Sequence, residues 1–385
     1  MNKILNNVKN SRTNSLLLFA VYFIINFLFL IKYGIRQSVV PFNILIVVFI
    51  AVHISIFFLR KNQLLTKKIN AKLVYLLTGV FALIYIVFCH VLKDPYQLNI
   101  DRWQTLNFSL EYWIHGKYIY DTYNFMGNLS SYLPGQLLLA LPSYLLGNVG
   151  YLQVMAFLLF SYTILREFKN NMIRFTAILM LGISLSYIYE AVCKSDFISS
   201  FMFVAAFILF WHNKFKDNYF QKPVMLGIGL GILFLTRSVA VIPLIIFLLK
   251  PFLAIDTGRK IKVSGAFLLT IAVLMLTVFF PAKNVDYIIQ HNPLALQGQS
   301  NKFVMLFFLV IAIFLSFYVK KISDVFYFSA YIVFLAMLNF VLEKYLLFGL
   351  GFYDNLFPTT YLAACLPFSI IAYCFSVRKE LEKEI

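Results

Sequence analysis

LVYLLTGVFALIYIVFCHVL, from Leu73 to Leu92, is a run of twenty residues without a charged side chain. A helix of that length rises about 30 Å, the thickness of the hydrocarbon core of a bilayer. Similar runs recur along the 385 residues, and the chain is 61% hydrophobic with a mean hydropathy of +0.82. Continuous rather than alternating apolar runs favour helices over a β-barrel, because a helix satisfies its own backbone hydrogen bonds in lipid. The sequence predicts an all-α, polytopic transmembrane helical bundle forming a single integral membrane domain over residues 1–385.

About twelve stretches are apolar enough to be membrane spans. The two that flank Thr236-Arg237-Ser238 hold only eleven or twelve residues and would cover about half a bilayer unless their flanks extend them. The first apolar run is full length and lacks a small-residue cleavage site, so we expect it to persist as an anchor. The predicted spans are Ser15 to Ile31, Pro41 to Leu59, Leu73 to Leu92, Gly150 to Leu165, Phe175 to Glu190, Phe197 to Trp211, Val224 to Leu235, Val239 to Leu249, Val263 to Phe280, Phe303 to Val319, Val325 to Leu342 and Tyr361 to Val377.

The net charge of +17 is distributed as a topology signal. If the amino terminus lies in the cytoplasm, 23 of the 33 Lys and Arg residues fall in inner segments and 10 in outer ones, as the positive-inside rule requires. This distribution argues against nucleic acid as a partner and points to membrane lipid instead. We expect a multi-pass protein of the plasma (inner) membrane with both termini in the cytoplasm.

A further apolar run, Leu133 to Gly147, is interrupted by Pro134, Gly135 and Pro142. Treating it as a crossing would flip every later loop and leave 13 basic residues inside against 20 outside, contrary to the positive-inside rule. The run is therefore predicted to be a half-inserted or interfacial helix packed against protein on the outer face. The loop of residues 93–149 then lies outside the cytoplasm and carries interfacial helices.

Motifs for several other functions are missing from the sequence. The four cysteines, Cys89, Cys193, Cys365 and Cys374, are too scattered for a disulfide framework or a thiolate metal site, so we expect them to serve packing. The five histidines show no metal-ligand spacing, and no phosphate-binding glycine loop is present. The run Gly227-Ile-Gly-Leu-Gly231 sits in an apolar span, where it favours close helix packing over phosphate binding. Nucleotide-driven pumping therefore has no support.

The loop that follows the quoted span is where chemistry is expected. It runs from Asn99 to Gly135, is dense in Tyr, Trp, Asn and His, and begins with Asp101 and Arg102 close to the membrane boundary. A carboxylate at that depth costs free energy unless it is paired, hydrated or functional. Asp101 is therefore a candidate catalytic residue and Arg102 a candidate substrate-binding residue. The alternative is an ordinary loop aspartate that forms an ion pair with Arg102.

A second acidic group lies in the outer turn EAVCKSD, from Glu190 to Asp196. Helix packing could bring it near Asp101, and two carboxylates facing one cleft can act as a base and as a ligand of a metal or hydroxyl. Asp196 is the second candidate catalytic residue, with Glu190 and Lys194 as substrate-binding candidates. Alternatively, the acidic residues mark helix ends, with Ser195 or Asp196 capping the next helix.

Arg237 is a lone cation between two short apolar helices. Its guanidinium could neutralise a phosphate, or its side chain could extend to the outer interface as an anchor. Among the other outer residues, histidines could hydrogen-bond a sugar and tyrosines could stack on it, although aromatic residues are common at membrane interfaces in any case. The candidate substrate-binding residues of this group are Arg237, His115, Tyr118, Tyr120, Tyr132 and His291.

The order of these segments carries a family resemblance. A span ending in an outer aspartate is followed by Gly-Lys-Tyr-Ile-Tyr, and then by Ser-Tyr-Leu-Pro-Gly leading into a Leu-rich helix. This arrangement resembles the first outer loop of the GT-C superfamily of membrane glycosyltransferases, which includes the protein O-mannosyltransferases, the aminoarabinose transferases and oligosaccharyltransferase. The resemblance continues more weakly through Lys194-Ser195-Asp196 to Arg237, and covers roughly Leu73 to Pro251.

The resemblance implies an inverting transfer of a sugar from a polyprenyl-phosphate donor to a lipid-linked or glycan acceptor on the outer side of the membrane. In the family pattern Asp101 matches the general base, Asp196 matches the acidic residue of the second outer loop, and Arg237 is a contact of the donor phosphate. This chemistry needs a base and stabilisation of a phosphate leaving group. It implies no certain cofactor, and a divalent metal stays an open alternative.

The chain departs from the family pattern in two ways. Two spans, within residues 1–72, precede the one that leads to Asp101, and no large soluble carboxyl-terminal domain is evident, which favours a small acceptor over a protein. We therefore expect two extra amino-terminal spans in residues 1–72, a GT-C-like catalytic module in 73–253 and carboxyl-terminal spans in 254–385.

Two other functions would use the same kind of substrate. A lipid-linked oligosaccharide flippase or transporter would place charged residues deep within its spans and show internal repeats, and neither is evident. A glycan polymerase of the O-antigen type would depend on outer arginines, for which only Arg36, Arg102 and Arg237 qualify. The gathering of acidic and aromatic residues on one face favours an enzyme.

Overall fold

The computed structural model describes residues 11–59, 69–92, 94–96, 100–297, 300–349 and 357–382. The prediction of an all-α protein is confirmed for these residues, which contain helices and, as their sole strand-like feature, an isolated antiparallel bridge between Tyr123 and Leu129. The chain forms two compact units, and each unit combines segments that are distant in the sequence. The expected division of the chain at residues 72 and 253 stays a prediction.

The first unit comprises residues 1–82, 161–189 and 323–385. Within it α2 packs along α20, and α20 also contacts α9. Every residue of α20 from Leu366 to Val377 is buried, so this helix forms the centre of the unit's core. The helices lying wholly or mostly in this unit are α2 (Ser11–Gly34), α3 (Phe42–Leu59), α9 (Asn171–Gly182), α18 (Ile322–Phe348), η4 (Phe357–Cys365) and α20 (Leu366–Leu381).

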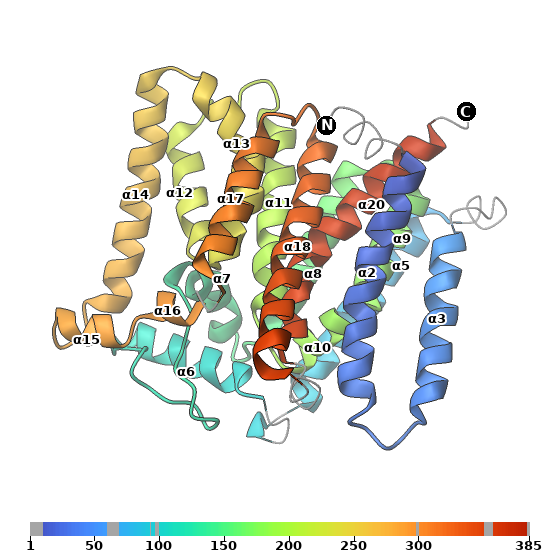
Figure 1. Cartoon of the computed structure of the whole chain (residues 1–385), viewed down its shortest axis with the longest axis horizontal. Helices are drawn as coiled ribbons and strands as arrows, with labels where there is room; N and C mark the ends of the chain where they lie inside the picture. The colour runs from blue at the N-terminus through green and yellow to red at the C-terminus, as the bar shows by residue number, and fades with distance from the viewer. Residues whose placement is uncertain are drawn as a thin grey trace. The chain divides into compact units, whose positions relative to one another are not determined.

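The second unit comprises residues 83–160 and 190–322 and holds the candidate site. In it α12 and α14 run side by side (Figure 1), and α13 packs on α17. Besides α18, whose first residue belongs to this unit, three helices contain residues of both units: α5 (Ala71–Val91), α8 (Tyr151–Glu167) and α10 (Leu185–Val192). The remaining helices of this unit are α6 (Arg102–Ile114), α7 (Pro134–Leu145), α11 (Phe197–Phe215), α12 (Pro223–Phe234), η2 (Ser238–Ala240), α13 (Val241–Ala254), α14 (Thr257–Phe279), α15 (Val285–Gln290), α16 (Pro293–Gln297) and α17 (Lys302–Ser316).

Glycines allow α12 to lie directly against α14. A Cβ atom at Gly227 would be 2.5 Å from the carbonyl oxygen of Val263, and one at Gly231 would be 2.8 Å from the Cβ of Thr270. Side chains larger than hydrogen would therefore push the two helices apart. The predicted packing role of this glycine run is confirmed.

The short helix α7 is held at its start by α12. Its 12 residues rise about 18 Å, too little to cross the bilayer core, as predicted for this run. A Cβ atom at Gly135 would lie 2.2 Å from the carbonyl oxygen of Ile232. The backbone N–H of Gln136 donates to the carbonyl of Leu235 at 3.2 Å. The first turn of α7 is thus docked against the last turn of α12.

Among the described residues, six helices are long and apolar enough to cross a membrane, and the number reaches eight if each of two bent helix pairs counts as one span. The bent pairs are α9 with α10, at 53°, and α15 and α16 with α17, at 59°. The other predicted spans correspond to the shorter helices α3, α8, α12 and η2 with α13. These helices indicate a multi-pass membrane protein, and the full count of about twelve spans stays a prediction.

Candidate functional site

A buried ion pair joins two breaks between helices of the second unit. Asp196, 1% exposed, lies between α10 and α11, and Arg237, 15% exposed, lies between α12 and η2. The Nη2 atom of Arg237 is 2.6 Å from Oδ2 of Asp196. The guanidinium also lies over the rings of Tyr132 and Phe197, 5.6 and 5.5 Å from their centroids. Arg237 is therefore directed at a partner within the protein, and is not the isolated cation that the sequence suggests.

This ion pair holds the Arg237 guanidinium in one position but adds little to the stability of the fold. The cost of removing two charges from water offsets most of their attraction, so such pairs add little net stability. Loss of one partner, by contrast, leaves a buried charge uncompensated and costs roughly 3–5 kcal/mol. A guanidinium held in one orientation loses less side-chain entropy when it binds an anion.

The start of α11 explains why the Asp196 carboxylate can pair with Arg237. Asp196 occupies the N-cap position, but its side chain makes no capping hydrogen bond. The bond comes instead from Glu190 of α10, whose Oε1 accepts the backbone N–H of Ile198 at 2.6 Å. The alternative, that Ser195 or Asp196 caps this helix, is confirmed for the position of Asp196 but not for its side chain. Glu190 is 1% exposed and acts as the cap, a contact within the protein.

The side chain of Asp101, at the start of α6, also forms no hydrogen bond with its own helix. It occupies the N-cap position and makes no side-chain capping bond. Its Oδ2 atom accepts the Nδ2–H groups of Asn124 at 2.9 Å and Asn128 at 2.8 Å. Among the described residues the alternative ion pair with Arg102 does not form, and Arg102 Nη1 instead donates to Ser195 Oγ at 3.2 Å.

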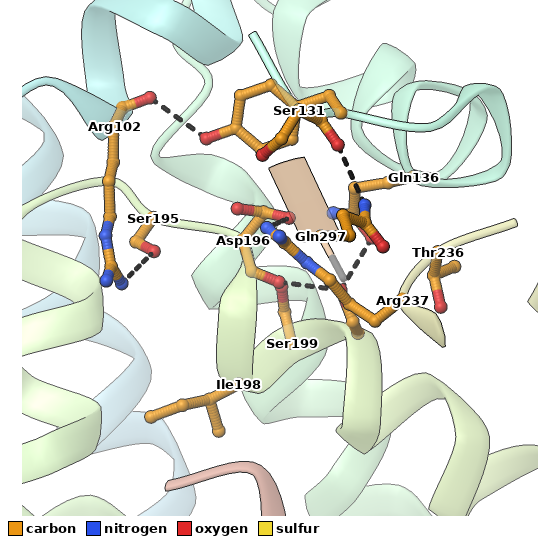
Figure 2. Close-up of polar contacts among 12 residues, drawn as sticks. Arg102, Ser131, Gln136, Ser195, Asp196, Ile198, Ser199, Thr236, Arg237 and Gln297 are labelled. Atoms are coloured by element: carbon orange, nitrogen blue, oxygen red, sulfur yellow. Dashed lines mark hydrogen bonds and ion pairs between the residues drawn. The ribbon is translucent and has the colours of Figure 1, made fainter. Parts of the chain in front are cut away.

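Arg102, the neighbour of Asp101 in the sequence, contacts the residue before Asp196 (Figure 2). Its guanidinium reaches Ser195, the neighbour of Asp196, and its backbone oxygen accepts the hydroxyl of Tyr132 at 3.2 Å. The Tyr132 ring in turn faces Arg237. Burial and the nearby Asp196 carboxylate raise the pKa of Tyr132 well above its usual value, so the phenol stays a donor. The charges of Asp101, Asp196 and Arg237 all act on the Tyr132 phenol, so the sequence-predicted aspartates and arginine lie in one region around this ring.

Gln136 is a site residue that the sequence does not single out. Its side chain is fully buried, and Ser200 Oγ, which also donates to the backbone oxygen of Asp196, lies 2.8 Å from Gln136 Oε1. The Nε2 atom has no partner among the described residues. Exchanging the amide nitrogen and oxygen leaves the other atom unpartnered, so one buried hydrogen-bonding group stays available on Gln136, whose side chain is joined through Ser200 to Asp196 (Figure 2). The available signal is a glutamine in the first turn of an otherwise apolar helix.

The Lys194 side chain caps the carboxyl-terminal end of α5. Its ammonium donates to the carbonyl oxygens of Cys89 at 3.2 Å and Leu92 at 3.1 Å, and lies 3.4 Å from the ring centre of Trp103. The last carbonyls of a helix lack partners within the helix and attract a cation. Burial lowers the pKa of Lys194 to about 8. The sequence predicts Lys194 to bind substrate, whereas these contacts give its ammonium a role in holding helices together.

The tyrosines predicted to stack on a sugar lie largely inside the protein. Tyr118, Tyr120 and Tyr132 are 8%, 1% and 4% exposed and belong to one buried cluster. The Tyr120 hydroxyl donates to the Tyr132 carbonyl at 2.9 Å. Burial raises the pKa of Tyr118 to about 12. These three rings hold the loop together and do not form an exposed surface for stacking a sugar, whereas Tyr123 of the same segment is 65% exposed.

The two histidine candidates contact backbone oxygens. His115 follows the last residue of α6, roughly 20 Å along the helix from Asp101, and its Nδ1 is 2.7 Å from the Glu111 oxygen. The Nδ1 atom of His291 is 3.1 Å from the Tyr287 oxygen. The structure does not bring His115 to Asp101, and no contact between His291 and the ion pair is found in the described part of the chain.

Metal-binding groups do not gather at the site. In the described ranges, no three His, Cys, Asp or Glu side chains come close enough together to hold a metal ion. The four cysteines are buried and form no disulfide there.

Comparison with known proteins adds no relative. No protein-family model matches the chain, and no match is found among curated proteins or solved structures.

Proposed function

We propose that this protein is a membrane glycosyltransferase that moves a sugar, with inversion, from a polyprenyl-phosphate donor to a lipid-linked or glycan acceptor outside the cytoplasm. The observation that supports this most is that the carboxylates of Asp101 and Asp196 bond to partners elsewhere in the chain and not to the helices that these residues begin. Both sit at N-cap positions, where a capping carboxylate is worth about 1 kcal/mol, and neither caps its helix. Side chains that depart from a stabilising local rule are typical of functional sites.

In the proposed reaction Asp101 is the general base. Its Oδ2 is engaged by two asparagine amides, so Oδ1 takes the proton of the acceptor hydroxyl as the hydroxyl oxygen attacks the anomeric carbon. The bond between that carbon and the phosphate oxygen breaks on the opposite face, which inverts the sugar and releases polyprenyl phosphate. A base in this position contributes roughly 10²–10⁴-fold to the rate.

Arg237 is proposed to bind the donor phosphate. A guanidinium suits two-point contact with phosphate oxygens, and the pair with Asp196 at 2.6 Å holds it in one orientation. In the orientation in which Gln136 Oε1 accepts from Ser200, the unpartnered Nε2 would give the same anion a neutral N–H donor. Together these groups would stabilise the negative charge that develops on the leaving phosphate.

Sequence features support the same assignment. The positions of Asp101, Asp196 and Arg237 coincide with those that the GT-C resemblance implies for base, second-loop acid and phosphate contact. The bias of Lys and Arg toward the other loops supports an outer location of the site, with both termini in the cytoplasm.

The proposal is tested in membranes that contain the chain, supplied with a panel of polyprenyl-phosphate-linked labelled sugars. Wild-type membranes should move label onto a lipid or glycan product. Arg237→Gln leaves Asp196 unpaired and should lower the melting temperature, and in the protein that remains folded it should lower kcat/KM for the donor about 100-fold, because a charge-assisted phosphate contact is lost. Arg259→Gln is the matched control, since Arg259 forms an exposed pair with Asp256 at the start of α14, and it should stay within about twofold of wild type.

Two results of this assay would contradict the proposal. Label that crosses the membrane without joining an acceptor would favour the flippase alternative. A wild-type chain that uses no donor in the panel would contradict the transferase directly.

A further inference from the structure

We propose that Asn124 and Asn128 are positioning residues that aim the Asp101 carboxylate at the acceptor hydroxyl, an inference that rests on the proposed function. The carboxylate of an N-cap aspartate usually turns back onto the first N–H groups of its own helix. The Asp101 carboxylate is turned instead toward the segment 124–128, where its two donors lie 23 and 27 residues downstream.

Asn124 is buried, and both the nitrogen and the oxygen of its side-chain amide form hydrogen bonds. Its Nδ2 donates to Asp101 Oδ2 and to Thr105 Oγ1, each at 2.9 Å. Its Oδ1 accepts the backbone N–H groups of Met126 at 3.0 Å and Asn128 at 2.9 Å. Thr105 Oγ1 closes the ring by donating to the Asp101 backbone oxygen at 2.7 Å. A buried amide with every donor and acceptor satisfied has one orientation, so it fixes Asp101 Oδ2 in space.

The turn that carries the second donor holds its shape through its backbone. The Asn124 N–H donates to the Asn128 carbonyl, and the Gly127 N–H donates to the Asn124 carbonyl, both at 2.9 Å. Gly127 has a φ of 78°, which glycine adopts without steric cost. The Asn128 side chain is exposed, and within the described residues its one side-chain hydrogen bond is with Asp101, at 2.8 Å. The side chain can therefore be changed without undoing the turn.

Two donors on one oxygen divide the carboxylate into a held oxygen and a reactive one. Oδ2 accepts both amides, and no hydrogen bond to Oδ1 is found from the part of the chain that the structure describes. A general base must meet the proton at a short and fixed distance, and a misplacement of about 1 Å can cost about 100-fold in rate. Loss of one amide should therefore act on the rate of transfer rather than on donor binding.

Asn128→Ala is the sharpest variant, because it removes one donor and leaves the backbone of the turn. Its kcat should fall about tenfold, with an unchanged KM for the donor and a fall of only about 2 °C in melting temperature, because one exposed hydrogen bond contributes little to stability. Asn128→Gln keeps the amide and should recover part of the loss. Met126→Ala, on a side chain of the same turn that is 47% exposed, is the matched control and should keep the wild-type kcat. A wild-type kcat in Asn128→Ala, or a loss that follows the melting temperature, would overturn the inference.

The same variants separate this inference from the proposed function. If Asp101→Asn loses sugar transfer while Asn128→Ala retains it in full, the function stands and the positioning role fails. If the wild-type chain transfers no sugar, the proposed function fails, and a double-mutant cycle on thermal stability still tests the contact. Asp101→Asn and Asn128→Ala should then be non-additive, and additive effects would contradict positioning.

Discussion

At the residue scale, Asp and Asn side chains at helix N-cap positions either cap their own helix or bond to partners elsewhere in the chain. Asn170 and Asp256 accept backbone N–H groups of α9 and α14, which is the ordinary use of an N-cap residue. Asp101 and Asp196 occupy the same position on α6 and α11 and form no such bond. The difference comes from partners elsewhere in the chain, which engage these two carboxylates.

Lys194 gives folding stability a dependence on pH that can be measured. Its pKa is lowered to about 8 in the folded protein, against about 10.4 for a lysine in an unfolded chain. Between these values the unfolded chain binds more protons, so stability should rise with pH in this window, by at most about 3 kcal/mol from this group. Melting temperatures in detergent between pH 7 and pH 10 should show a wild-type advantage over Lys194→Met that grows with pH.

A matched control isolates this effect from the other titrating groups. Lys117 is exposed, so Lys117→Met should follow the wild-type curve over the whole range. A difference between wild type and Lys194→Met that is constant or shrinks as pH rises would mean that the pKa of Lys194 is not lowered.

At the element scale, the docking of α7 on α12 holds the backbone of Gln136 against Leu235, two residues before Arg237, and it depends on Gly135. In Gly135→Ala the new methyl group would lie 2.2 Å from a backbone oxygen, so we expect a loss of roughly 3 kcal/mol or more and of sugar transfer. Gly265→Ala in α14 is the control, because a Cβ there meets nothing within 4 Å and should stabilise the helix slightly. Thermal unfolding in detergent compares the two, and equal tolerance would contradict the close contact.

The sequence predicts the helices of this protein better than it predicts the contacts of the site. Long apolar runs define a helix by themselves, and the prolines and glycine of the run around α7 mark it as short. Asp101, Asp196 and Arg237 can be chosen because a charge between apolar helices is unusual. Asn124, Asn128 and Gln136 are uncharged, and their importance comes from residues far along the chain, so local pattern does not reveal them.

At the scale of the whole molecule, the sidedness of the loop before α7 is open to a direct test. Met126 is 47% exposed and the four native cysteines are buried, so Met126→Cys should react with a membrane-impermeant maleimide on intact cells. Asp217→Cys, at an exposed position before α12, should react only after the cells are permeabilised. Labelling with the opposite pattern would place the candidate site on the cytoplasmic side and contradict the orientation derived from charge.

The proposed function itself depends on one carboxylate, and sugar transfer by Asp101→Asn tests it most directly. The variant keeps the shape of the side chain and should insert into membranes in wild-type amounts. Membranes carrying it should transfer labelled sugar from polyprenyl phosphate at least about 100-fold more slowly than wild type, because the amide cannot take the acceptor proton. Transfer at the wild-type rate would contradict Asp101 as the base and, with it, the proposed reaction at this site.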